Sequence, residues 1–465
     1  MKKFLLLFLA LSSVSFSQLG NYNMYLLKNL DTHRIPPQFN PPWHFAACWG
    51  YVAPNGMEYA ILGCGMGTMI VDITDSASIS ERYFRPAAIN LNNPDIGNIW
   101  REMKVYSHYL YVVSEADTSG VEIFDLQYLP DSVRYVGKYF VTGHSSTHSI
   151  SQSGPYLYLN GANSSFGQGT TILDLTNPEQ PVKRGSWNVE YVHDSRTVND
   201  TLFTSNINTG KLAIFNVSNK DSVKFIASFQ TLPNPATHNS AVTRDRKYIF
   251  TTDETSSPPG KLKICNIENI FNAVFAANWQ PTGITNTIVH NVEIYGDTAV
   301  IAHYQAGVRV LNIANPTAPV EIAWYDTYPS ANTNQFAGCW GVYKFPSGKI
   351  IASDMNRGLF VLKMGVPFGI IPISGEVPVS FGLSQNYPNP FNPNTKIRFN
   401  VPHSEFVKIA VYDALGKEVS VLVNQQLKGG VYEADFKASN LPSGVYFYSL
   451  TAGNFKETKK MMLIK

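Results

Sequence analysis

Charge is scarce in this 465-residue chain. Only 15% of its residues are charged, 36 basic and 34 acidic, which gives a net charge of +2, and no dense run of Lys and Arg occurs. Binding to nucleic acid requires a basic surface that neutralises phosphates, so nucleic acid is not expected as a partner. With 44% hydrophobic residues, the chain is predicted to be globular and to form two or three domains.

Long apolar runs are also missing. The first residues, MKKFLLLFLALSSVSFSQLG, contain two lysines, a run of about ten apolar residues and a small-x-small step that ends at Ser17. This pattern predicts a signal peptide over residues 1–17. A membrane anchor needs about 20 apolar residues, and no later segment reaches that length. We therefore expect an exported protein without a transmembrane segment.

Motifs of known enzymes are absent as well. The sequence contains no Gly-x-Ser-x-Gly motif and no local His-x-Glu-x-x-His spacing. Of the four cysteines, Cys48 and Cys339 are expected in neighbouring parts of the fold, so either a disulfide or two free thiols is compatible with the sequence. Cys64 and Cys265 are expected to be buried thiols. No residue is assigned a catalytic role.

What the chain does contain is turn-forming and aromatic residues: 33 Gly, 28 Pro and 13% aromatics, which favour short strands. Seven similar apolar strands, each opening with glycine, recur at intervals of 41 to 53 residues. They are GTMIVDIT (67–74), GVEIFDLQ (120–127), GTTILDLT (169–176), GKLAIFNVS (210–218), GKLKICNIE (260–268), GVRVLNIA (307–314) and GLFVLKM (358–364). Seven four-stranded units predict a seven-bladed β-propeller over residues 18–366. The seventh unit lacks a fourth strand, which residues 21–30 are expected to supply.

The third strands resemble the LVIVD repeat. The run HNVEIYGDTAVIAHYQAGVRVLNIANPTAPVEIAWYDTYP, followed by GVYKFPSGKIIASDMNRGLFVL, is similar to the choice-of-anchor B family. That resemblance implies an exported bacterial propeller with a C-terminal anchor and no assigned activity. In units four to seven the final Asp of the repeat is replaced by Asn216, Asn266, Asn312 and Lys363, so this position is not a metal ligand shared by every unit.

The C-terminal segment has a different composition. After a linker predicted over 367–380, short alternating strands predict a small Ig-like β-sandwich over residues 381–465. The motif NYPNPFNP and the closing SGVYFYSL resemble the type A sorting domain of the type IX secretion system. This resemblance implies transport to the outer-membrane surface or the medium, and removal of the tail or its replacement by surface lipopolysaccharide. A carbohydrate-binding module is the alternative.

A candidate site follows from aligning the first strand of each unit. The equivalent positions are predicted to be Trp49, Trp100, His148, His193, His238, His290 and Trp340. The first strand of a propeller blade is the innermost, so these residues are expected to form a ring at one mouth of the channel. Polar residues of the strand 2–3 connections, among them Asp253, Glu254 and Asp354, are expected on the same face.

The four histidines, His148, His193, His238 and His290, have two interpretations. They could bind a divalent transition metal, with Asp194 or Glu102 as nearby carboxylates, or each could hydrogen-bond the backbone of a neighbouring blade. The tryptophans likewise either bind a glycan or peptide or pack against one another. We expect a secreted or cell-surface binding and interaction module. A metal-dependent hydrolase or lactonase that uses the histidine ring is the alternative.

Overall fold

The computed structural model describes residues 21–37, 43–87, 99–116, 119–141, 146–161, 168–255, 260–365, 370–374, 377–438 and 441–465. The predicted signal peptide, residues 1–17, lies outside the described residues. Within these ranges the chain forms β-strands and no α-helix, which confirms the predicted all-β fold. No helix in this part of the chain is therefore long and apolar enough to cross a membrane.

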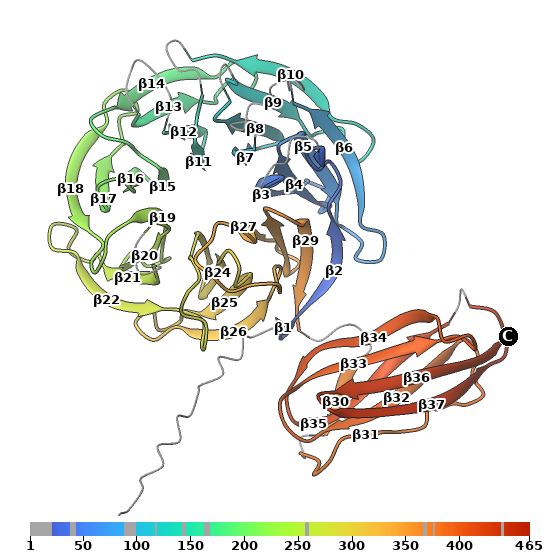
Figure 1. Ribbon diagram of the computed structural model, residues 1–465. Helices are drawn as coiled ribbons and strands as arrows, with labels where there is room; N and C mark the ends of the chain where they lie inside the picture. The colour runs from blue at the N-terminus through green and yellow to red at the C-terminus, as the bar shows by residue number, and fades with distance from the viewer. Residues whose placement is uncertain are drawn as a thin grey trace, which may run out of the picture.

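The described residues before 366 form seven antiparallel units of four strands around a central channel (Figure 1). The units are β3 (Phe45–Val52), β4 (Glu58–Cys64), β5 (Gly67–Asp72) and β6 (Ser80–Pro86); β7 (Arg101–Tyr106), β8 (Tyr109–Ser114), β9 (Val121–Asp125) and β10 (Arg134–Tyr139); β11 (Ser149–Ser153), β12 (Tyr156–Asn160), β13 (Thr170–Asp174) and β14 (Val182–Trp187); β15 (Asp194–Val198), β16 (Thr201–Asn206), β17 (Lys211–Asn216) and β18 (Lys224–Gln230); β19 (Thr237–Val242), β20 (Tyr248–Asp253), β21 (Leu262–Asn266) and β22 (Val274–Trp279); β23 (Asn291–Tyr295), β24 (Thr298–Ala302), β25 (Val308–Asn312) and β26 (Val320–Tyr325); and β27 (Cys339–Lys344), β28 (Lys349–Asp354) and β29 (Gly358–Met364) with β2 (Met24–Leu30). The first strand of each unit borders the channel and contacts the first strand of the next unit.

The ring is closed by the N-terminal segment. Strand β2 pairs antiparallel with β29, from Met24 opposite Met364 to Leu30 opposite Leu359, and so supplies the outer strand that the seventh unit lacks. Met24 is fully buried in a cluster with side chains of units six and seven. Just before it, β1 (Asn21–Tyr22) pairs with the outer strand β26. Residues 21–30 thus occupy the position that the sequence assigned to a closing strand.

Close approach of the outer strand explains five of the recurring glycines, which are Gly67, Gly120, Gly169, Gly307 and Gly358. At Gly307, where φ is +76°, an added Cβ would lie 2.2 Å from the carbonyl oxygen of Tyr325. At Gly358 an added Cβ would lie 2.2 Å from the carbonyl oxygen of Leu30, in the closing strand. Real Cβ atoms do not approach a carbonyl this closely, so only glycine fits there without displacing the fourth strand.

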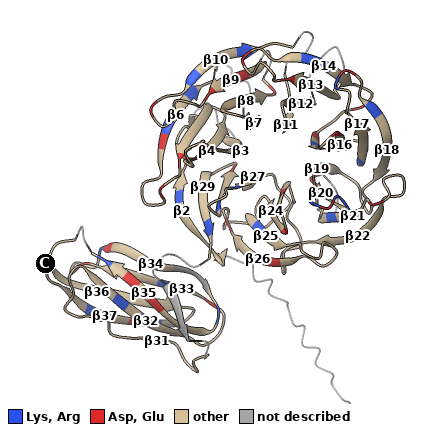
Figure 2. Cartoon of the chain, turned by 180° about the vertical axis from the view of Figure 1, so that it is seen from behind, with Lys and Arg blue, Asp and Glu red and all other residues tan. Residues whose placement is uncertain are grey.

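The polar residue that ends the third strand also has a structural role. Asp72, Asp125, Asp174, Asn216, Asn266 and Asn312 each accept a hydrogen bond from the backbone N–H two residues ahead. Such turns form equally well with Asp and Asn, which explains why the repeat tolerates both. In the first three units the Asp also pairs with an Arg of the outer strand, so charges of both signs lie along the rim (Figure 2).

The C-terminal part forms two sheets that enclose a core of their own (Figure 1). One contains β30 (Ile370–Ser374), β35 (Gly430–Lys437), β32 (Asn394–Val401) and β31 (Gly382–Leu383); the other contains β34 (Glu418–Leu427), β33 (Glu405–Tyr412), β36 (Gly444–Ala452) and β37 (Phe455–Leu463). Residues 370–374 fall in the predicted linker, yet they pair with β35 as an edge strand. The sandwich therefore begins earlier in the chain than its sequence motifs indicate.

Candidate functional site at the channel mouth

Six of the seven predicted ring residues line one small cavity on the channel axis. Its volume is about 10 Å³, which is room for a single water or ion. The side chains that come together there are Trp100, His148, His193, His238, His290 and Trp340, with Glu102 and Asp194 also in the wall. Each comes from a first strand or the residue directly before it.

Trp49 does not belong to this ring. Cys48 pairs with Leu62 as Val342 pairs with Ala352, and a bulge interrupts both first strands, between Phe45 and Cys48 and between Cys339 and Gly341. Trp49 is therefore equivalent to Tyr343, onto which its ring packs edgewise at 5.0 Å, and it lies in a deeper layer of the channel. The sequence alignment matched two Cys-Trp-Gly triplets that occupy different positions in their strands, and the residue equivalent to Trp340 is Ala46.

The four imidazoles follow one another around the cavity. Their ring centroids are separated by 4.0 Å between His148 and His193, 4.4 Å between His193 and His238, and 4.3 Å between His238 and His290. The Nε2 atoms of His148 and His193 lie 3.0 Å apart. The histidines thus form an arc over four neighbouring units.

Every Nδ1 atom of the arc has a partner. Those of His238 and His290 donate to the backbone carbonyls of His290 and Trp340, while that of His148 donates to the Glu115 carboxylate. The Nδ1 of His193 hydrogen-bonds the Tyr191 hydroxyl at 3.1 Å. A carbonyl only accepts hydrogen bonds, so the proton of neutral His238 and His290 sits on Nδ1 and their Nε2 atoms carry lone pairs. His238 and His290 thus form the hydrogen bonds to the backbone of a neighbouring unit that were one of the two interpretations of the histidines. These bonds leave Nε2 of both rings available.

Glu254 extends into the arc from the end of strand β20. Its Oε2 lies 3.5 Å from Nε2 of His238 and its Oε1 lies 3.6 Å from Nε2 of His290. The Tyr304 hydroxyl donates to the same Oε1. Nε2 of His290 is buried and has no hydrogen-bond partner. The carboxylate therefore faces two imidazole nitrogens without forming a good hydrogen bond to either.

Burial controls the protonation of the arc. It holds the pKa of His193 and of His290 well below the ordinary range, with further lowering by the neighbouring imidazoles, and it lowers that of His238. Burial by itself would lower the pKa of His148 as well. The hydrogen bond and the charge of Glu115, together with the charges of Glu102 and Glu254, outweigh burial and raise this pKa. At neutral pH the arc thus has three neutral imidazoles.

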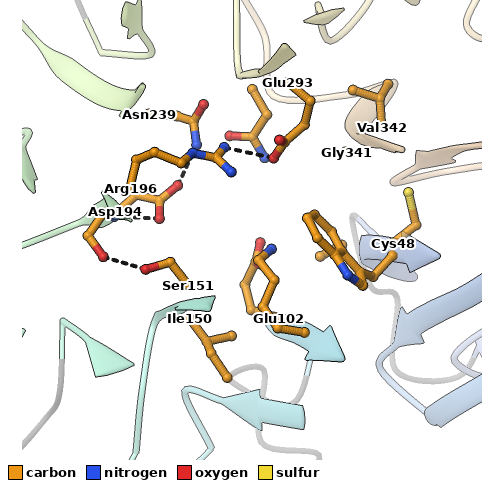
Figure 3. A pocket seen from close by; sticks show the side chains of 15 residues that line it. Cys48, Glu102, Ile150, Ser151, Asp194, Arg196, Asn239, Glu293, Gly341 and Val342 are labelled. Atoms are coloured by element: carbon orange, nitrogen blue, oxygen red, sulfur yellow. Dashed lines mark hydrogen bonds and ion pairs between the residues drawn. The ribbon is translucent and has the colours of Figure 1, made fainter. Parts of the chain in front are cut away.

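A second cavity of about 30 Å³ lies deeper on the axis (Figure 3). Arg196 donates to Glu293 at 2.8 Å, and the Asn239 amide donates to Asp194. Lys104 lies 4.0 Å from Glu102 and 3.6 Å from the Trp49 ring centroid. Glu102 and Asp194 line both cavities, and burial raises the pKa of Glu102 to about 7.

The tryptophans pack on one another. Trp100 stacks on Trp340 with centroids 4.8 Å apart, and Trp43 covers the other side of Trp100 at 5.2 Å. Tyr304 and His290 contact Trp340 as well. This contact pattern matches the packing interpretation, in which the rings complete the wall opposite the histidines.

Two predicted carboxylates lie outside the ring. Asp253 forms an ion pair with Lys263 and accepts the backbone N–H of Ala236. Asp354 accepts the backbone N–H groups of Asn356 and Arg357, both at 2.9 Å. Burial raises the pKa of each to about 6. Both residues hold the end of a second strand, a position that sequence alone does not distinguish from an open loop tip.

Several residues at the site were not predicted as part of it. Tyr304 and Tyr191 orient Glu254 and His193, and Arg196 and Glu293 bridge the channel between units four and six. No short motif carries these residues, because they meet only when distant units face one another across the axis. The four cysteines, Cys48, Cys64, Cys265 and Cys339, are buried free thiols, so the Cys48–Cys339 disulfide is not formed.

The fold has many counterparts among solved structures. They include the periplasmic gluconolactonase of Pseudomonas aeruginosa (9% identity, 84% of this chain and 99% of that one, TM-score 0.47) and a protein from Lactobacillus plantarum (11%, 85% and 100%, 0.49). Another is a hypothetical selenium-binding protein from Sulfolobus tokodaii (12%, 91% and 97%, 0.45). We transfer no function from likenesses this weak. No curated protein matches the sequence.

Two family models match the sequence itself. One describes the secretion system C-terminal sorting domain and matches residues 385–465; the other describes the LVIVD repeat and matches residues 288–327. The sorting domain indicates export by type IX secretion to the outer-membrane surface or the extracellular space, and implies contact with that machinery. The chain thus contains an LVIVD repeat over residues 288–327 and a type IX secretion sorting domain over residues 385–465.

Proposed function

We propose that this exported propeller binds a divalent transition-metal ion at the channel mouth, within the arc formed by the imidazoles of His148, His193, His238 and His290. The observation that carries the proposal is the state of their Nδ1 atoms. All four are engaged by an acceptor or a hydroxyl. Metal-binding histidines have this arrangement, because the outer hydrogen bond fixes the ring and directs the other nitrogen to the ion.

The size of the cavity supports an ion as its occupant. A space of about 10 Å³ accepts one water-sized particle and excludes a sugar ring or a peptide side chain. Imidazole nitrogens suit zinc, copper, iron and nickel better than calcium or magnesium, which prefer oxygen. We therefore favour a first-row transition metal over a glycan or peptide at this position.

The charges along the axis also favour a cation. The carboxylates of Glu102, Asp194, Glu254 and Glu293 lie around the two cavities. Apart from the Arg101–Glu122 and His148–Glu115 pairs, the described basic side chains beside them are Lys104 and Arg196. Buried charge without a counter-ion is unfavourable. A divalent ion would neutralise this excess of negative charge and would favour the ionised form of Glu102, whose pKa burial raises to about 7.

The proposal is tested on the full-length protein after removal of bound metal by chelator. We expect one equivalent of zinc, copper or manganese to bind and to raise the melting temperature, because a ligand that binds only the folded state stabilises it. His193→Ala and His238→Ala should abolish the shift. His108→Ala is the control, since His108 lies in the turn between β7 and β8, away from the cavity. A protein whose melting is unaffected by all three metals contradicts the proposal.

A metal-dependent hydrolase or lactonase remains the alternative function. A bound ion would activate water for attack on an ester, but a cavity of about 10 Å³ leaves no space for such a substrate beside the ion. We therefore propose binding, with the metal as part of a surface module, in preference to catalysis. Turnover of esters, lactones or glycosides by the metal-loaded protein that is lost in His193→Ala and His238→Ala would instead support the enzyme.

A further inference from the structure

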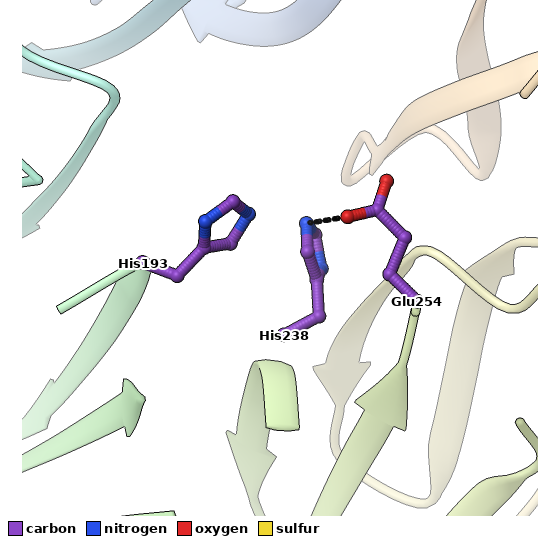
Figure 4. Close-up of side chains that lie close together, drawn as sticks. All are labelled: His193, His238 and Glu254. Atoms are coloured by element: carbon purple, nitrogen blue, oxygen red, sulfur yellow. Dashed lines mark ion pairs between the residues drawn. The ribbon is translucent and has the colours of Figure 1, made fainter. Parts of the chain in front are cut away.

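The side chains at the channel mouth differ in how close their possible metal-ligand atoms lie to one another. One ligand atom from each of His193, His238 and Glu254 lies within 4.8 Å of the others (Figure 4). Among the described residues this is the one group of three such side chains with that spacing. His148 and His290 flank it, each near one member, but do not join the compact set.

The Glu254 carboxylate is oriented as a metal ligand would be. The Tyr304 hydroxyl holds Oε1, which leaves Oε2 directed at Nε2 of His238 across 3.5 Å. That nitrogen carries a lone pair because its Nδ1 donates to a carbonyl. Two lone-pair atoms that face each other repel unless a proton or a cation lies between them. Metal–ligand bonds of about 2.0–2.2 Å allow two ligands of one ion to be 3.5 Å apart.

We infer that the protein ligands are His193, His238 and Glu254, and that the ion keeps an open position for a water molecule or a small anion. This inference rests on the proposed function. Two imidazoles and one carboxylate leave coordination positions free, as in catalytic zinc sites and non-haem iron sites.

The Nε2 atom of His290, which has no hydrogen-bond partner, can accept a hydrogen bond from a water molecule bound to the ion. This atom is buried, carries a lone pair because Nδ1 donates to the Trp340 carbonyl, and lies 3.6 Å from Glu254. A water molecule bound to the ion beside Glu254 can donate a hydrogen bond to it. His290 is therefore a positioning residue for the bound water, and not itself a ligand.

The experiment uses full-length protein loaded with Co²⁺, whose visible absorption reports ligand number, and azide as the small anion. We expect azide to change the spectrum of the native protein. Cobalt affinity, measured by competition with a chelator, should fall more than about 100-fold in His193→Ala, His238→Ala and Glu254→Gln. In His148→Ala, His290→Ala and Tyr304→Phe it should fall only about tenfold, as for groups outside the coordination sphere.

Equal losses of affinity for all four histidine variants, with no effect of azide, would overturn the inference and indicate a closed four-imidazole site. In that case the proposed function would stand, whereas a native protein that takes up no cobalt would end both. Should an alanine variant not fold, as judged by its metal-free melting curve, His193→Gln and His238→Gln replace it, because glutamine preserves more of the side-chain volume.

Discussion

At the scale of single residues, the channel mouth is built from histidines whose outer nitrogens are fixed before any ligand arrives. The backbone carbonyls that hold His238 and His290 belong to the next unit in the ring. Orientation of these rings therefore depends on the packing of neighbouring units. A substitution that shifts unit six or seven is expected to disturb the site without touching an imidazole.

Asp354 provides a test of buried charge away from the histidines. Burial raises its pKa from 3.8 to about 6, and Asp326 and Arg357 are the charged groups beside it. A carboxyl with a raised pKa in the folded state stabilises less as pH rises from 4 to 7, because the folded protein must release the proton. At about 1.4 kcal/mol per pKa unit, the loss is up to about 3 kcal/mol.

We expect Asp354→Asn to remove this loss. The amide oxygen can still accept the backbone N–H of Asn356 and carries no charge. Relative to the native protein, the variant should gain stability between pH 4.5 and pH 7.5, measured by urea unfolding at both values. A constant difference between the two proteins across that range would show that Asp354 is already ionised at the lower pH.

At the scale of the strand, the glycine that opens each third strand is the feature that sets the repeat. We expect Gly307→Ala to cost more than about 3 kcal/mol, because its Cβ would displace the outer strand at Tyr325. Gly296→Ala is the matched control in the same unit: its φ of +60° is similar, but nothing lies within 4 Å of the added atom. It should cost about 1 kcal/mol. Equal costs in thermal or urea unfolding would show that backbone conformation alone selects glycine.

The closing strand β2 covers the edge of β29 in the seventh unit. Deletion of residues 21–30 exposes the edge of β29 and removes the buried Met24, so we expect insoluble or oligomeric protein. Met24→Lys should have the same effect in milder form, whereas Lys28→Ala, on the exposed side of the strand, should not. Size-exclusion chromatography distinguishes the outcomes, and a monomeric deletion variant would contradict closure by this strand.

The sequence predicts elements better than it predicts the site. The glycine-led strands and the closing segment have a period and a composition that can be read directly. In contrast, the Cys-Trp-Gly triplets of the first and seventh units look equivalent in sequence, yet Trp49 is equivalent to Tyr343 and no local pattern signals this offset. Asp253 and Glu254 are adjacent in sequence, yet one pairs with Lys263 of the neighbouring strand β21 and the other faces His238. Their separation depends on contacts between units.

At the scale of the whole molecule, the propeller and the sorting domain are separate cores with separate roles. Because residues 385–465 match the sorting domain, their deletion should leave the protein folded but retained in the periplasm. Cell fractionation with detection of the propeller tests this. Export unchanged by the deletion would contradict the role of the tail, and removal of the tail from mature protein, or its replacement by lipopolysaccharide, stays a prediction that mass spectrometry of the secreted form can test.

The metal at the channel mouth is the central claim, and anomalous diffraction from crystals of zinc-loaded full-length protein tests it most directly. We predict a peak in the cavity at about 2.0–2.2 Å from Nε2 of His193 and of His238 and from the Glu254 carboxylate. Zinc peaks confined to surface side chains, with none within bonding distance of any imidazole of the arc, would contradict the account.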